Sequence, residues 1–500
     1  MASIEELKKV RLEKLEQIKK TGVNPYPNSV DRTHTISELE GDFEGLVEAG
    51  NPITIVGRIM SLRGQGAISF VDLFDGTGRF QSLFKKDNQI NYTGSENIEN
   101  EMDSFQFFRD VIDESDFVEV TGNLFVTDRG QKTIEVSEWR MVAKSLLPMP
   151  DEHYGLKDED ERYRKRYIDI LLNPEIHTMI ERKSKFWNSI RSFLLERDYV
   201  EVQTPVLENT TGGADAAPFM THHNALDIDV YLRISAGELW QKKLMVSGLP
   251  KTFEIGRIFR NEGMSNEHLQ DYTQVEFYEA FSDYKKGMLM VKELYQKIAN
   301  ETFGTTEFEI NEQKVDLAGD WEIYDYVKIL NDHFNIDILE DDVDVFVEKL
   351  KENKIDFDKD INKEKAVDTL WKSIRRGYVG PGFLINVPVF LEPLAKKTEG
   401  GKTVERFQVI LGGSEMGKGF SELNDPIDQS ERFEHQEKMR EAGDDEAQMK
   451  DNSFVEALEH GMPPSFGFGI SERLFSVLSG KSVRETSIFP LMRPKENKKD

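Results

Sequence analysis

The sequence predicts an α+β protein with at least two domains, a small antiparallel β-barrel followed by a larger antiparallel sheet covered by helices. Apolar residues alternate with period two from residue 53 to 144, which indicates short strands. Helical periodicity returns over residues 180–196, and strands and helices then mix without the regular alternation of parallel βαβ units. A chain of 500 residues is also too long for one ordinary core.

The chain is expected to begin with one amphipathic helix within an N-terminal helical segment at residues 1–50. Ser3 and Glu6 have the spacing of a capping box, and Gly22 suits the end of the helix. Residues 1–22 carry six Lys or Arg against four Glu, so contact with RNA and packing on the helix's own domain both remain open. The apolar residues at helical spacing are Ile4, Leu7, Leu15 and Ile18.

Five short strands are predicted next, in a domain placed at residues 51–147. Hairpin turns are indicated at residues 75–78 and 128–130. So many strands in under ~100 residues favour a small barrel of the oligonucleotide-binding type, whose sheet face stacks bases on aromatic side chains. Aromatic residues of a small barrel also form its core, so both interpretations stay open for them. The candidates for base contact are Arg63, Phe70 and Gln81. The strands are predicted near residues 53–62, 67–74, 79–83, 117–127 and 132–142.

A linker is predicted at residues 148–180, because two prolines are followed there by a charged polar stretch. The second domain is placed at residues 181–500. Residues 340–368 are highly charged and helical in pattern, and we interpret them as part of an inserted, solvated subdomain at about 320–385.

Composition excludes several classes of function. The chain has no cysteine, so a disulfide framework, a thiolate zinc site and a thiol nucleophile are excluded. It has no apolar run of ~20 residues and no apolar signal core at the N-terminus, so we expect no membrane span and a cytoplasmic location. The net charge of -28 argues only weakly against nucleic acid, because charge acts locally.

Residues 253–278 form the most informative run, a predicted strand–loop–strand. Arg257 and Glu276 lie inside otherwise apolar strands, where a charge is costly unless it has a partner. An internal salt-bridge network and a binding site are both compatible with this pattern.

Several runs together resemble the class II aminoacyl-tRNA synthetases, and the bacterial type of lysyl-tRNA synthetase fits best. Residues 199–205, an alternating strand that ends in proline, resemble motif 1, and residues 467–473 resemble motif 3. Each run alone is weak, but their joint order is specific to the family. The residues that match motif 2 are Arg260, Glu262, His268, Tyr272, Glu276 and Tyr278. The other similar runs are 212–219, 221–224, 413–425, 442–447, 457–464 and 488–494.

This resemblance implies a class II catalytic domain at residues 181–500 that attaches L-lysine to tRNA(Lys) through a lysyl-adenylate. The carboxylate of lysine attacks the α-phosphorus of ATP and diphosphate leaves, and AMP is released when tRNA accepts the lysyl group. Two anions must meet, and a bidentate guanidinium bridges them better than an ammonium does. Arg260 and Arg473 match the catalytic arginines of motifs 2 and 3. The implied ATP-binding residues are Arg260, Glu262, His268, Tyr272, Glu415 and Arg473.

The same resemblance implies a lysine pocket made of acceptors for two ammonium groups. Gly213, Glu238 and Glu276 match the residues around the α-ammonium, and Tyr278 and Glu422 match those around the ε-ammonium. A buried ammonium needs such partners, and a buried carboxylate rejects a substrate that lacks the ammonium.

The implied cofactor is Mg²⁺, held between the ATP phosphates and carboxylates. Glu415 matches one metal-binding Glu of the family, whereas Gln408 stands in place of the second. Glutamine offers an oxygen without a charge, which puts the number of bound ions in question. Lys418 and Ala217 are further departures, since the family usually has Asn and Arg there, and the glycine-rich run of motif 3 is one residue shorter.

The implied partners are ATP, L-lysine and tRNA(Lys), with the anticodon on the barrel at Arg63, Phe70 and Gln81. The motif 1 resemblance implies a homodimer, although Asp198 stands where Gly is common before that strand. Two alternatives remain. An aspartyl- or asparaginyl-type enzyme shares both domains but needs cations in its pocket, and a non-catalytic paralogue is disfavoured by the presence of Arg260 and Arg473.

Overall fold

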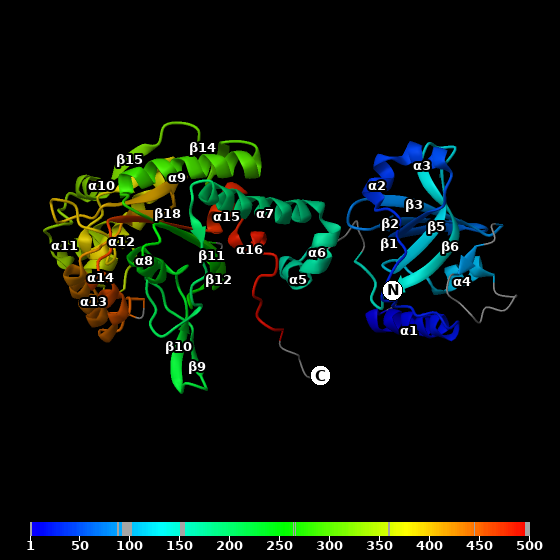
Figure 1. The fold of residues 1–500 in the computed structure, drawn as a ribbon, viewed down its shortest axis with the longest axis horizontal. Coiled ribbons are helices and arrows are strands. Elements are labelled where there is room, and N and C mark those ends of the chain that lie inside the picture. The colour runs from blue at the N-terminus through cyan, green and yellow to red at the C-terminus, as the bar shows by residue number, and fades with distance from the viewer. Residues whose placement is uncertain are drawn as a thin grey trace. The chain divides into compact units, whose positions relative to one another are not determined.

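The computed structural model describes residues 3–87, 90–92, 103–150, 156–263, 265, 267–358, 361–444 and 446–495. The chain forms two compact units, Met1–Arg162 and Tyr163–Asp500 (Figure 1). The boundary between them lies inside the segment predicted as a linker. Within the described residues, no helix combines the length and apolar character that crossing a membrane requires.

The smaller unit is a closed five-stranded barrel, as predicted. Its strands follow the order β3-β2-β1-β5-β6, and a parallel pairing between β3 and β6 closes the cylinder. A short additional strand, β4 (Asn91–Tyr92), pairs with β6 and was not predicted. The barrel strands are β1 (Ile53–Gln65), β2 (Ile68–Phe74), β3 (Arg79–Lys85), β5 (Phe117–Val126) and β6 (Lys132–Ala143).

Four helices share the core of this barrel. The predicted capping box of α1 (Ile4–Lys20) is present, with Ser3 and Glu6 bonded reciprocally. Ile18 of α1 is fully buried in the same cluster as Phe43 and the barrel residue Trp139, so the first helix has a packed face. The other helices are α2 (Ile36–Gly41), α3 (Phe43–Ala49) and α4 (Ser104–Val111).

The larger unit is built on an eight-stranded sheet with the order β15-β16-β17-β18-β19-β12-β11-β7. Its six central strands are antiparallel, as predicted, but both edge strands pair in parallel, β15 with β16 and β7 with β11. The purely antiparallel expectation is therefore corrected at the edges, where long connections return the chain in the same direction. The strands are β7 (Val200–Glu201), β11 (Lys251–Phe259), β12 (Asp271–Ala280), β15 (Glu322–Asp325), β16 (Gly382–Ile385), β17 (Arg406–Leu411), β18 (Ser414–Ser421) and β19 (Ser465–Ser471).

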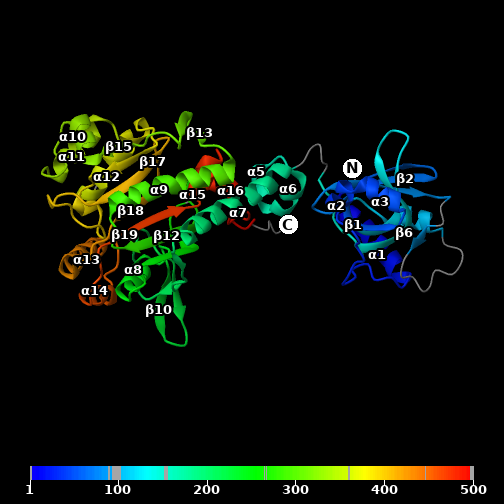
Figure 2. The same ribbon diagram turned by 45° about the horizontal axis from the view of Figure 1, so that its top comes forward.

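Alternation along the central strands gives the sheet two different faces. Val275 and Phe277 of β12 pack in one cluster with helices α7 (Pro174–Leu195) and α9 (Tyr284–Ile298). Glu276 and Tyr278 point to the opposite face, toward the cavity. Helix α8 (Glu238–Val246) packs on that face of the sheet (Figure 2). The polar positions of β12 are thus presented together on one side of the sheet.

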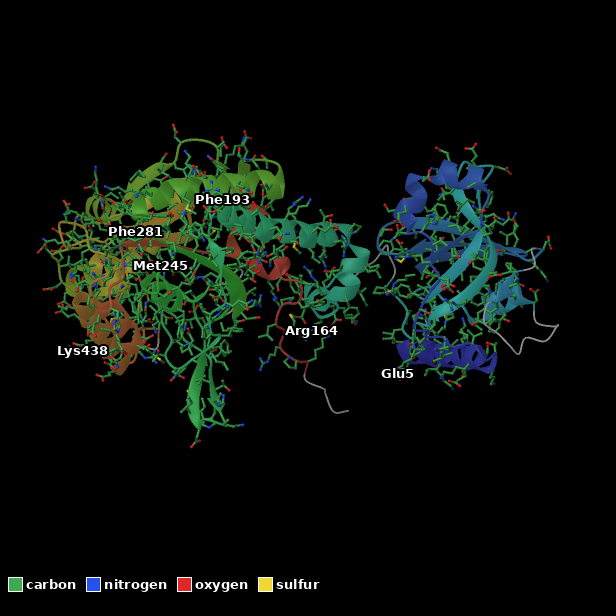
Figure 3. All side chains as sticks on the ribbon, viewed as in Figure 1. Glu5, Arg164, Phe193, Met245, Phe281 and Lys438 are labelled. Atoms are coloured by element: carbon green, nitrogen blue, oxygen red, sulfur yellow. The ribbon has the colours of Figure 1, made fainter. Side chains whose placement is uncertain are left out.

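Each face of the sheet has its own hydrophobic cluster. Phe193 of α7 lies in the first and Met245 of α8 in the second, and both residues are buried and labelled in Figure 3. The charged stretch 340–368, expected to be solvated, also has a buried side. Phe346 and Leu370 lie in the same cluster as Tyr278. The helices of this region therefore pack on the domain, with their charges on the outside. They are α10 (Tyr326–Phe334), α11 (Val343–Glu352) and α12 (Lys363–Ile374).

Other elements that follow the barrel are short or peripheral, and the first of them crosses the boundary between the two units. They are α5 (Glu159–Arg164), α6 (Arg166–Leu172), β8 (Leu207–Glu208), β9 (Met220–His223), β10 (Ile228–Leu232), a π-helix (Ala299–Phe303), β13 (Glu307–Ile310), β14 (Gln313–Asp316), α13 (Pro426–Glu441), α14 (Asn452–Glu459), α15 (Arg473–Leu478) and α16 (Val483–Thr486).

Candidate active site

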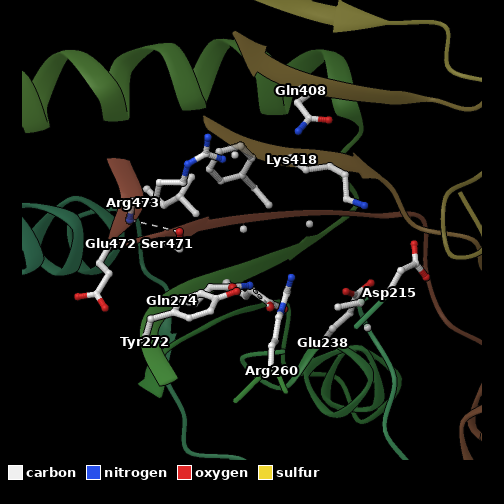
Figure 4. A pocket seen from close by; sticks show the side chains of 18 of the residues that line it. Asp215, Glu238, Arg260, Tyr272, Gln274, Gln408, Lys418, Ser471, Glu472 and Arg473 are labelled. Atoms are coloured by element: carbon white, nitrogen blue, oxygen red, sulfur yellow. Dashed lines mark hydrogen bonds between the residues drawn. The ribbon is translucent and has the colours of Figure 1, made fainter. Parts of the chain in front are cut away.

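A cavity of about 360 Å³ lies over β12, β18 and β19 in the larger unit. Figure 4 shows Tyr272 and Arg473 at one end of it, and Lys418 and Asp215 at the other. It brings together residues separated by more than 200 positions in the chain. The predicted site residues that line it are Gly213, Glu238, Arg260, Glu262, His268, Tyr272, Glu276, Tyr278, Gln408, Glu422 and Arg473.

Arg260 lies just after β11, and its position is set by the fold. Its Nε donates a hydrogen bond to the carbonyl of Ile234 at 3.3 Å. Its guanidinium carbon lies 5.8 Å from the ring centroid of Tyr272, which brings a cation and an aromatic face to the same part of the cavity. Glu262 is fixed beside them through its carbonyl, which accepts from Gln270 Nε2 at 3.4 Å.

Arg473 is the first residue of α15 and lies at the same end of the cavity as Tyr272. It donates to the carbonyl of Glu415 at 3.4 Å and to the carboxylate of Glu267. Burial and the nearby Arg473 lower the pKa of His268, so its imidazole is neutral at pH 7. The contact between Glu267 and Arg473 places an anion against the arginine that is expected to bind phosphate. Glu267 was not among the residues predicted from the sequence.

Glu276 is buried on β12 and surrounded by neutral donors. Its carboxylate accepts from Ala236 N at 2.8 Å, Gln274 Nε2 at 2.6 Å and Tyr278 Oη at 2.9 Å. Burial and the nearby Glu238 raise its pKa to about 7. Arg257, the other charge predicted inside these strands, instead pairs with Asp271 at an exposed position. The salt-bridge interpretation thus holds for Arg257, whereas Glu276 forms no ion pair among the residues that the structure describes.

Glu238 and Glu422 are buried at the same end, and both contact Lys242. The Nζ atom of Lys242 lies 2.7 Å from Glu238 Oε1 and 2.5 Å from Glu422 Oε2. Burial raises the pKa of Glu422 to about 8, against the opposing effect of Lys242. Sequence reasoning missed Lys242, because a Glu and a Lys four positions apart in a helix are typical of a solvated surface pair.

Two glycines make room for these carboxylates. Gly213 has a φ of +87°, and a Cβ there would lie 2.7 Å from Glu238 Cβ. A Cβ at Gly467 would lie 2.2 Å from Glu422 Oε1 and 2.4 Å from the ring of Tyr278. A side chain at either position would displace a predicted lysine contact.

Glu415 and Gln408 lie side by side, but Glu415 does not line the cavity. The carboxylate of Glu415 accepts from Trp371 Nε1 at 2.6 Å and Gln408 Nε2 at 3.1 Å. Arg375 lies 3.5 Å away, and Arg406 donates to the amide oxygen of Gln408. Among the described residues, no three His, Asp or Glu side chains are grouped to hold a metal ion. This donor set fits only an ion that takes most of its oxygen ligands from phosphate and water.

The two departures at positions 418 and 217 have different local settings. Lys418 Nζ lies 3.3 Å from Glu392, which also pairs with Arg406 at 2.6 Å. The backbone carbonyl of Ala217 accepts from Asn261 N at 2.8 Å, which links the substrate loop to the motif 2 loop without a side chain.

The predicted base-contact residues all lie on the outer face of the barrel. Arg63 and Phe70 are cross-strand neighbours, and Arg63 pairs with Asp72 at 2.8 Å. Gln81 stands opposite Asp72 and donates to Thr133 at 2.8 Å. The inward positions of β2 are Ser69, Val71 and Leu73, so Phe70 is half-buried outside the core.

Of the motif 1 strand predicted at residues 199–205, only β7 (Val200–Glu201) is formed, at an edge of the sheet. Asp198 has a φ of +64°, the left-handed conformation that favours glycine, so the turn is retained without Gly. Val200 of β7 is 49% exposed, as is Leu207 at 48%, so apolar side chains stand open beside this edge.

Comparison with known proteins finds a match over nearly the whole chain. Residues 158–493 match the family described as tRNA synthetases class II (D, K and N), and residues 53–142 match the OB-fold nucleic acid binding domain. The chain is 39% identical over 499 residues to a lysine–tRNA ligase of Thermosipho africanus, covering 98% of this chain and 97% of the relative. Lysine–tRNA ligases of Bacillus subtilis and Thermotoga maritima are 39% and 37% identical, over 97% and 99% of this chain and 96% and 97% of the relatives.

Proposed function

We propose an assignment of residues for a chain that belongs to the lysine–tRNA ligases, a class II tRNA synthetase family. As a member of that family it is an enzyme that attaches L-lysine to tRNA at the expense of ATP, through a lysyl-adenylate. The assignment rests on one observation, the separation of charge along the cavity. Three buried carboxyls, Glu238, Glu276 and Glu422, gather at one end, and the two arginines Arg260 and Arg473 lie around Tyr272 at the other, where Glu262 and Glu267 are their acidic neighbours.

The acidic end binds the two ammonium groups of L-lysine. Gly213, Glu238 and Glu276 receive the α-ammonium, and Tyr278 and Glu422 receive the ε-ammonium. Burial of these acceptors supports selectivity, because a substrate without the ammonium leaves a buried carboxylate without a cation. The same acidity disfavours aspartate and asparagine as substrates.

The arginine end binds ATP. Tyr272 stacks on the adenine, Glu262 contacts its edge, and Arg473 holds the γ-phosphate end after Glu267 releases it. Neutral His268 donates a hydrogen bond to the triphosphate without adding charge. These contacts hold the nucleotide so that its α-phosphate faces Arg260.

Adenylate formation then needs positioning and neutralisation of charge. A carboxylate oxygen of lysine attacks the α-phosphorus, a new P–O bond forms, and the bond to the diphosphate breaks with its electron pair. Arg260 donates to both the carboxylate and the α-phosphate, so it neutralises charge where the two anions meet. In the second step a ribose hydroxyl of tRNA attacks the adenylate carbonyl and AMP leaves.

Of the two positions that match the metal site of the family, only Glu415 would offer a carboxylate to a Mg²⁺ ion bound to ATP, with the amide of Gln408 as its neutral neighbour. Such an ion supplies positive charge to the phosphates. Trp371 and Gln408 hold the Glu415 carboxylate in a defined orientation toward that role.

The barrel reads the anticodon of tRNA(Lys) through Arg63, Phe70 and Gln81. Their position on its outer face supports this, because stacked bases need an accessible aromatic ring. Phe70→Ala is expected to slow lysylation of tRNA about 10-fold through the loss of one stacked base, while ATP–diphosphate exchange is unchanged. An equal loss in both assays would contradict the assignment.

The active form is a homodimer joined along the β7 edge, with a cytoplasmic location where ATP and tRNA are available. The exposed Val200 and Leu207 support the dimer, because apolar side chains beside an open strand edge favour association. Sedimentation equilibrium of the chain and of Val200→Asp measures it. A monomer in both cases would contradict it.

The substrate is tested by ATP–diphosphate exchange with each amino acid in turn. Exchange is expected with L-lysine and not with aspartate or asparagine. Exchange that depends on aspartate or asparagine alone would overturn the assignment of the acidic end.

A further inference from the structure

Lys242 is a buried cation just behind the acidic end of the cavity. It lies on α8, one turn after Glu238, and its side chain is 1% exposed. Its Nζ atom contacts both Glu238 and Glu422, at 2.7 and 2.5 Å, and lies 5.3 Å from the ring centroid of Phe420. Burial acts to lower the pKa of this ammonium, but Glu238 and Glu422 outweigh it and raise the pKa, so Lys242 is charged.

The charges at this end are arranged for a ligand with two ammonium groups. Glu238, Glu276 and Glu422 supply three buried carboxylates and Lys242 one buried ammonium, which leaves two negative charges when all are ionised. Asp215 and the partly exposed Lys418 at the same end add one charge of each sign. One ammonium needs only one carboxylate to form an ion pair, so the excess negative charge is available to a cationic ligand. Both carboxyl oxygens of Glu422 are buried without a hydrogen bond of good geometry among the described residues, although Glu422 lines the cavity; Oε2 has the Lys242 ammonium at 2.5 Å, and Oε1 has no ion-pair partner.

We propose that Lys242 determines specificity as the fixed counter-ion of Glu422, so that the substrate side chain meets a carboxylate that still requires one ammonium. Lys242 does not touch the substrate in this proposal and acts through Glu422. The inference rests on the proposed lysine pocket.

The physical reason is the cost of a buried carboxylate. With Lys242 present, the pKa of Glu422 is about 8, and the ammonium of an arriving lysine is enough to displace its proton. Without the ammonium at 2.5 Å, Glu422 would hold that proton more firmly and stay a neutral acid toward the substrate. A neutral acid tolerates an uncharged side chain, because no buried charge is then left without a partner. Loss of Lys242 therefore weakens selection for lysine over its uncharged analogue more than it weakens ATP binding.

Lys242→Met in the full-length enzyme tests this, with L-lysine and L-norleucine compared by kcat/KM in ATP–diphosphate exchange. The ratio of the two values is expected to fall at least about 10-fold, while KM for ATP changes less than about twofold. Lys243→Met is the matched control. Lys243 is the next residue of α8, and its Nζ bonds Ser453 at 2.7 Å away from the cavity, so the ratio should not change.

A second variant separates the charge of Lys242 from a purely structural role. Lys242→Arg retains the cation and is expected to keep the lysine-to-norleucine ratio within about threefold of the parent. If Lys242→Met does not fold, Lys242→Gln, which retains a donor but no charge, is measured instead and should lose the ratio.

An unchanged ratio in the uncharged variant, or an equal loss in the Met and Arg variants, would overturn the proposal. Failure of the proposed function has a different signature, because the parent enzyme itself would then show no lysine-dependent exchange.

Discussion

The two ends of the cavity are held in place in different ways. At the acidic end, Glu276 lies within a central strand and Glu422 directly follows another, and Ala236, Tyr278 and Lys242, which contact them, are buried with them. At the arginine end, Arg473 is held by Glu267 of the loop between β11 and β12, at a partly exposed contact. The acidic end is therefore preorganised for two small cations, whereas the arginine end must exchange a protein anion for the phosphates of ATP.

The largest effect is expected when Arg260 is replaced. Arg260→Ala should slow adenylate formation about 1000-fold, because no other group is assigned to bridge the carboxylate and the α-phosphate. Single-turnover formation of lysyl-adenylate measures it. Arg257→Ala, at the exposed pair with Asp271, is the matched control and should retain activity. An unchanged rate in Arg260→Ala would remove this residue from the chemistry.

Glu422→Gln tests whether a change at the acidic end affects the choice of amino acid without affecting the binding of ATP. The preference for L-lysine over L-norleucine should fall about 100-fold, because the buried carboxylate becomes a neutral amide, while KM for ATP changes little. Both constants come from exchange kinetics. Similar losses in lysine and ATP binding would mean that the two ends are not independent.

The pH dependence of lysine use sharpens the same contrast. The pKa of Glu276 is raised to about 7 and that of Glu422 to about 8. Both carboxyls are protonated in the free enzyme below these values, and the ammonium groups of lysine bind the ionised forms, so binding releases protons. The KM for lysine should fall as pH rises from 6 to 8.5. Each carboxyl that must ionise can lower it by up to about 10-fold per pH unit below its pKa, and KM for ATP should not show the same pH dependence. A KM for lysine that rises over this range would contradict the assignment.

The smallest effect is expected at Glu267. Glu267→Gln removes the anion that competes with phosphate for Arg473, so KM for ATP should fall about threefold, as suits a partly exposed pair. KM for lysine should stay constant. If KM for ATP instead rises, Glu267 contributes to nucleotide binding and does not compete with it.

Local pattern was sufficient where the structure depends on near neighbours. The period-two alternation of residues 53–144 predicted the strands of the barrel, and Ser3 with Glu6 predicted the start of α1. Ordered motifs predicted the family, and 11 of the assigned site residues line one cavity. Such features are carried by residues close in the chain, or by motifs whose types already state their chemistry.

Features that depend on distant parts of the chain were decided by the tertiary structure. The parallel edge strands, and the buried side of the charged helices at residues 340–368, depend on how long connections return. In the sequence, Lys242 is indistinguishable from a surface lysine. It becomes the buried partner of two carboxylates because the fold brings Glu422, 180 positions later in the chain, into contact with it. Composition and motifs thus determined which chemistry the chain performs. Packing decided how many charges meet at its acidic end, because electrostatic balance in a buried site depends on distances that no local pattern contains.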